Sequence, residues 1–165
     1  MLTSDGLSVN QFLHLWRDAM ADAAPAERAR LMVELGRATL REQGQVPTLL
    51  VAVVTGRDEP LTLIPLKEAP GVARPGLREQ VAERLAALGA TEVYVLQAVV
   101  AGRVTGPGTQ LMACWGEGGK GQEVCAMLPL RVTADGVEEA ELLLAPDPSA
   151  TVFSRDLAGL LPTRH

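Results

Sequence analysis

Aromatic residues and lysines are scarce in this sequence. Aromatic residues make up 3% of the 165 positions, and the only lysines are Lys67 and Lys120, against thirteen scattered arginines. The formal net charge is −5. Bases and sugars stack on aromatic side chains, and a phosphate backbone binds along a basic stripe. The composition therefore argues against a nucleic acid or a glycan as the partner.

Cysteine, histidine and long apolar runs are lacking as well. Cys114 and Cys125 are too few for a disulfide framework, and with His14 and His165 as the only histidines no metal ion or other cofactor is expected. The longest unbroken apolar run, Leu49 to Val54, is far shorter than the ~20 residues of a membrane span. The N-terminus lacks the basic and apolar regions of a secretory signal. We therefore expect a cytoplasmic protein that binds no membrane.

The length and patterning predict one domain with three parts. Two independent cores would be cramped in a chain of this size. Residues 1–45 are expected to be helical, residues 46–145 to form an α/β sheet core, and residues 146–165 to be a Pro-rich C-terminal tail with a mobile end and one helical turn near residues 155–161.

A helical hairpin is predicted at the N-terminus, over residues 8–44. Ser8 is placed to cap the first helix, Pro25 suits the first turn of the second, and Gly44 ends it. The first helix has an apolar face at helical spacing, formed by Val9, Phe12, Leu13, Trp16, Ala19 and Met20.

The period then changes to that of strands. Residues 48–55 are apolar on both alternating faces, which is typical of a covered central strand, and Pro65 makes residues 61–66 an expected edge strand. After a loop at 67–74, a helix is predicted from Pro75 to Leu88. Further strands are expected at 91–100, 110–117, 122–132 and 136–144, with a loop at 102–108.

These elements predict an α+β fold. An N-terminal helical hairpin is followed by a mixed, mostly antiparallel sheet of about five or six strands with one crossover helix, in the order α-α-β-β-α-β-β-β-β. In the last strand, Glu138, Glu139 and Glu141 resemble the charges that protect a sheet edge.

A two-residue turn at Gly118-Gly119 is the predicted centre of a β-hairpin. It places Ala113 opposite Val124 and puts Cys114 and Cys125 together on one apolar face. That face needs a cover, either the N-terminal helices or another subunit.

The motif search finds weak candidates for chemistry. Gly116, Gly118 and Gly121 match G-x-G-x-x-G, but a strand follows where a dinucleotide site needs a helix. One stripe of the first helix carries His14, Asp18 and Asp22, which could be a base with its orienter, part of a metal site, or a solvated polar face. We interpret the row of Arg30, Glu34, Arg37 and Arg41 as a solvent-side ion-pair ladder.

Two functions remain open. The first is a non-catalytic protein-interaction or regulatory module whose partner is itself, as a homodimer, or another protein. It rests on the absence of a catalytic constellation and on more apolar strand faces than three helices can cover. The second is a small-ligand-binding protein or enzyme with a pocket near the Cys114/Cys125 face. The candidate ligand-binding residues for such a pocket are His14, Asp18, Cys114, Glu123 and Cys125.

Overall fold

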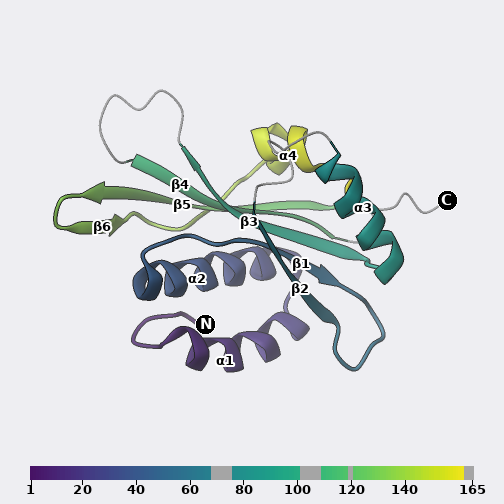
Figure 1. Cartoon of the computed structure of the whole chain (residues 1–165), viewed down its shortest axis with the longest axis horizontal. Coiled ribbons are helices and arrows are strands. Elements are labelled where there is room, and N and C mark those ends of the chain that lie inside the picture. The colour runs from purple at the N-terminus through teal and green to yellow at the C-terminus, as the bar shows by residue number, and fades with distance from the viewer. Residues whose placement is uncertain (68–75, 101–108, 119–120, 162–165) are drawn as a thin grey trace.

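The computed structural model describes residues 1–67, 76–100, 109–118 and 121–161 (Figure 1). The helices are α1 (Val9–Asp22), α2 (Pro25–Gln43), α3 (Leu77–Leu88) and α4 (Val152–Leu157), with a short 3-10 helix at Pro148–Ala150. The strands are β1 (Thr48–Val53), β2 (Leu61–Leu66), β3 (Glu92–Val100), β4 (Thr109–Glu117), β5 (Glu123–Thr133), β6 (Gly136–Glu139) and β7 (Leu143–Leu144). The α+β prediction is confirmed, with two N-terminal helices followed by an antiparallel sheet of seven strands. Within the described residues, no helix is long and apolar enough to cross a membrane.

The predicted helical hairpin is confirmed, together with its boundaries. The Ser8 hydroxyl accepts a hydrogen bond from the Gln11 backbone, and the Gln11 side chain accepts one from the Ser8 backbone, which makes a capping box at the start of α1. Pro25 lies in the first turn of α2, and Gly44 ends α2 with φ +73°. The left-handed conformation at Gly44 favours glycine.

The sheet has the order β2-β1-β3-β4-β5-β6, with β7 also pairing with β5. Strands β2 and β3 are both antiparallel to β1, so they are parallel to each other, and α3 lies in the connection between them. Strand β2 is an edge strand, as Pro65 predicted. The predicted helix start at Pro75, the predicted loop at 102–108 and most of the loop at 67–74 lie outside the described residues.

Helices cover both faces of the sheet. Successive side chains along a strand point to opposite faces of the sheet, one covered by α1 and α2 and the other by α3 and α4. In β1, Val51 packs on the face covered by α1 and α2, and Leu50 packs on the face covered by α3 and α4. The C-terminal segment differs from the tail we predicted, because α4 begins at Val152 and its Phe153 and Leu157 are buried against the sheet. The face that holds Cys125 is thus covered by α3 and the C-terminal segment, whereas α1 and α2 cover the face that holds Cys114.

The predicted register of the β4–β5 hairpin is wrong. Ala113 lies opposite Met127, not Val124, and the strands end at Glu117 and resume at Glu123. Residues 118–122 therefore separate them in place of a two-residue turn; Gly119, one of the two predicted turn residues, lies outside the described residues. A shift by an odd number of residues reverses the faces of one strand relative to the other. Cys114 and Cys125 accordingly lie on opposite faces of the sheet.

The predicted last strand is divided into β6 and β7. Glu139 pairs with Leu130 and Leu143 pairs with Met127, so four steps along this strand match three along β5, as in a β-bulge. The bulge lies beside Pro129, whose carbonyl accepts from the Ala140 backbone at 3.0 Å but which has no N–H to donate in return. The missing donor explains why regular pairing stops there.

Candidate protein-binding groove

The structure separates the residues predicted to form a pocket. His14 and Asp18 lie on the exposed side of α1. Cys114 is fully buried among the side chains packed under α1 and α2, whereas Cys125 packs on the opposite face with α3 and α4. Glu123 lies on that opposite face too, two residues before Cys125 on β5. The five candidates therefore do not form one site.

The two cysteines are free thiols in apolar surroundings. Burial raises the pKa of Cys114 well above its ordinary value, and burial raises the pKa of Cys125 to about 11. A thiol must ionise to act as a nucleophile or to bind a metal. Both cysteines therefore pack as small apolar side chains at neutral pH.

Glu123 is held by a tryptophan. The Trp115 indole donates to Glu123 Oε2 at 3.0 Å, and Glu117 lies directly opposite on β4. Burial, with repulsion from Glu123 as a smaller cause, raises the pKa of Glu117, while a hydrogen bond from the Gly159 backbone opposes the shift. Glu117 Oε2 is buried without a hydrogen-bond partner among the described residues. The folded protein therefore favours the protonated form of the Glu117 carboxyl group.

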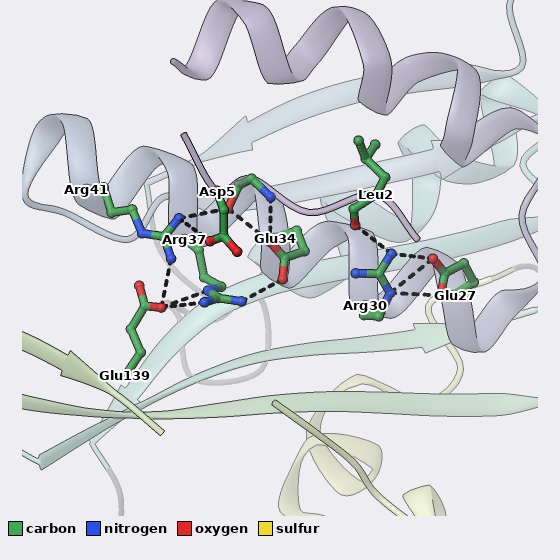
Figure 2. Close-up of polar contacts among 9 residues, drawn as sticks. Leu2, Asp5, Glu27, Arg30, Glu34, Arg37, Arg41 and Glu139 are labelled. Carbon is green, nitrogen blue, oxygen red and sulfur yellow. Dashed lines mark hydrogen bonds and ion pairs between the residues drawn. The ribbon is translucent and has the colours of Figure 1, made fainter. Parts of the chain in front are cut away.

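The charged row on α2 is not a solvent-side ladder, which corrects our interpretation. Glu34 is 2% exposed, and its Oε2 accepts from both the backbone and the hydroxyl of Ser4, at 2.9 Å each (Figure 2). Arg30, which also pairs with Glu27, donates to the Leu2 carbonyl at 2.8 Å. The N-terminal segment crosses this side of α2, so charges that an isolated helix would expose anchor that segment instead.

The same row reaches the sheet edge through Glu139 on β6. Glu139 pairs with Arg37 at 2.7 Å and with Arg41 at 3.0 Å (Figure 2). Of the three glutamates predicted to protect the edge, Glu139 is thus engaged by α2, whereas Glu138 and Glu141 are exposed. These ion pairs join α2 to β6.

A groove lies beside these ion pairs, which we call the α2–β6 groove. One part, of about 450 Å³, is lined by Leu40, Arg41, Val137 and Glu139. A second part, of about 410 Å³, shares Leu40 and Val137. Its other lining residues are Gly44, Gln45, Val46, Ala98, Gln110 and Leu130. The groove exists because β5 and β6 extend past the C-terminal end of α2, which leaves the sheet uncovered there (Figure 1).

Exposed apolar side chains continue from the groove along the sheet edge. Val137, Leu143 and Leu144 are 43%, 49% and 51% exposed, and we call these three residues the β6–β7 rim. Leu144 pairs with Ala126 and points to the same face as Val137, while Leu143 points to the other. Sequence reasoning missed this rim because it gave weight to the glutamates; the run Leu142-Leu143-Leu144 was the available signal.

Comparison of the chain with protein-family models, curated proteins and solved structures found no match. The function is therefore argued from the groove and the rim themselves.

Proposed function

We propose that this protein is a non-catalytic protein-interaction module that acts as a homodimer and binds a further protein at the β6–β7 rim. The observation that carries the proposal is the exposure of Leu143 and Leu144 on the same sheet edge as Val137, which is exposed and lines the α2–β6 groove. Covering a half-exposed leucine stabilises a complex by about 1 kcal/mol. Leu143 and Leu144 are neighbours in the chain, and exposed apolar side chains with a polar border occur at protein-binding surfaces.

The groove offers apolar walls with balanced charge. Its charged lining residues, Arg41 and Glu139, form an ion pair with each other, so neither is left to bind a charged small molecule. Glu138 and Glu141 stand exposed at the border of the rim. A protein segment that covers leucines and places polar or basic groups at this border fits the surface better than a small metabolite does.

A matched pair of variants tests the binding of a further protein. Leu144→Lys changes the rim, and Leu15→Lys changes a leucine of equal exposure, 50%, on the outer side of α1. Proteins retained by the tagged wild-type chain from its own cells are identified, and each is then titrated as a purified protein. We expect a partner whose affinity for Leu144→Lys falls at least tenfold while Leu15→Lys binds as the wild type does. Equal affinity for both variants contradicts the role of the rim.

A further inference from the structure

Strand β2 forms the other edge of the sheet, and half of its backbone groups have no hydrogen-bond partner among the residues that the structure describes. The Val54 N–H donates to the Pro60 carbonyl at 2.7 Å, which shows that Pro60 directs its backbone groups toward β1. The direction alternates along a strand, so Leu61, Leu63 and Pro65 direct theirs outward. Pro65 has no N–H, but the outward donors of Leu61 and Leu63 remain, as do the outward carbonyls of all three residues.

Strand β2 itself carries no charged side chain that would protect this edge. Residues 61–66 are Leu-Thr-Leu-Ile-Pro-Leu, and the nearest charges are Glu59 before the strand and Lys67 after it, both exposed. Natural sheet edges that stay unpaired are usually guarded by charges, bulges or covering segments. Within β2, the protecting residue is Pro65, which removes one outward backbone N–H donor.

We propose that β2 pairs antiparallel with β2 of a second copy of this chain, around a two-fold axis at Leu63. This inference rests on the homodimer of the proposed function and names its interface. Each Leu63 would donate to and accept from Leu63 of the partner subunit, and each Leu61 would donate to the carbonyl of Pro65 of the partner subunit. On the side chains, Leu63 meets the partner's Leu63, so the apolar surface of the edge is covered by an identical surface.

The flanking charges select this register. With the axis at Leu63, Glu59 lies opposite Lys67 of the partner subunit, and the symmetry repeats the pair on the other side. Moving the axis to Thr62 places Lys67 opposite Arg57 of the partner subunit, which is repulsive. Moving it to Ile64 places Lys67 opposite Leu61 of the partner subunit and leaves the charge without a partner. The edge is therefore self-complementary in one register only.

This dimer is compatible with partner binding at the rim. Strands β2 and β6 form opposite edges of the sheet. Pairing through β2 joins the two sheets into one continuous sheet and leaves a β6–β7 rim at each far end. The dimer would thus present two equivalent binding sites.

Charge reversal at the two exposed flanking positions tests the proposal without disturbing the core. The variants are Glu59→Lys, Lys67→Glu and the double variant with both changes, and the measurement is the dimer dissociation constant by analytical ultracentrifugation. Each single variant places like charges at both ends of the interface, so we expect its dissociation constant to rise about tenfold, and the double variant to recover the wild-type value. Arg57→Glu, which faces no charge in the proposed register, serves as the control and should dimerise as the wild type does.

Mixing the two single variants gives a second readout. In a mixed dimer every lysine at position 59 or 67 faces a glutamate. With one of the two variants isotopically labelled so that the masses differ, native mass spectrometry should show more heterodimer than random mixing gives. A wild-type dimer that is unaffected by either single change, with statistical mixing, overturns the β2 interface while the homodimer itself stands. A monomeric wild type overturns both the interface and the homodimer, and leaves rim binding to its own test.

Discussion

Gly116→Ala should destabilise the fold because Gly116 makes room for a tyrosine ring. Gly116 pairs with Tyr94 across β3 and β4. A Cβ atom at position 116 would lie 2.4 Å from Tyr94 Cδ1 and 2.5 Å from Cε1, well inside van der Waals contact. The ring is fully buried, and its hydroxyl donates to Glu92 Oε1, so it has little freedom to move aside.

The expected penalty follows from two opposed effects. Overpacking of a buried site costs about 1–3 kcal/mol, and replacing glycine by alanine in a strand returns about 0.5–1 kcal/mol. The free energy of unfolding should therefore fall by about 1.5 kcal/mol, which corresponds to a melting temperature about 5 °C lower in a chain of this size.

A double-mutant cycle with Tyr94→Leu isolates the contact. Urea unfolding of the four proteins gives the coupling energy between positions 94 and 116. Without the ring, the alanine at position 116 should be neutral or slightly stabilising. The claim that Gly116 is needed to make room for the Tyr94 ring is refuted by either of two results. One is a Gly116→Ala protein as stable as the wild type, and the other is a penalty of the same size in the Tyr94→Leu background.

Three further outcomes are expected. Glu117→Gln should raise the free energy of unfolding at pH 7, because the pKa of Glu117 is raised and its charged form is the unfavourable one; solvent screens this partly exposed group, so the gain should stay below about 1 kcal/mol. The gain should vanish toward acidic pH, where Glu117 is protonated, and a gain that persists there contradicts the reasoning. Cys114 and Cys125 should not react with Ellman's reagent in the folded protein at pH 8 and should both react in urea, and rapid labelling of the native state would show that the thiols are accessible. Because the pKa of Cys125 is raised to about 11 in the folded protein, the free energy of unfolding should decline as the pH rises from 9 to 11. Glu34→Gln should lower the free energy of unfolding by about 2 kcal/mol and speed amide hydrogen exchange at Ser4, because the carboxylate binds both the Ser4 backbone and Arg37. Unchanged exchange at Ser4 would mean that Glu34 does not anchor the N-terminal segment.

The helices and edge strand were predictable because local chemistry defines them. Ser8, Pro25 and Gly44 each act within one turn of their own helix, and Pro65 marks an edge wherever its strand lies. Their signals need no knowledge of the rest of the fold.

The hairpin register and the second face depended on residues far apart in the sequence. A glycine pair suggested a short turn, but the register follows from the whole length of β4 and β5 packed against α2. Gly36 of α2 allows this close approach, because a Cβ atom at position 36 would lie 2.3 Å from Met112 Sδ. Likewise, the short helix α4 has a weak pattern, and only the sheet shows that Phe153 and Leu157 face inward.

The candidate site was not predictable from residue types alone. The sequence directed attention to cysteines and a histidine, which the fold places on three separate surfaces. The groove arises from a mismatch in length between α2 and the strands beneath it, and no motif records such a mismatch. Glu34 and Arg37 were assigned to solvent for the same reason, because the N-terminal segment that covers them is remote in sequence.

The subunit number in solution tests the central proposal most directly. A native mass spectrum of the purified chain should show a species of twice the 17.5 kDa chain mass at micromolar concentration. It should carry no additional bound mass. A monomer at 17.5 kDa, above all one that retains a defined small molecule, contradicts the homodimeric interaction module.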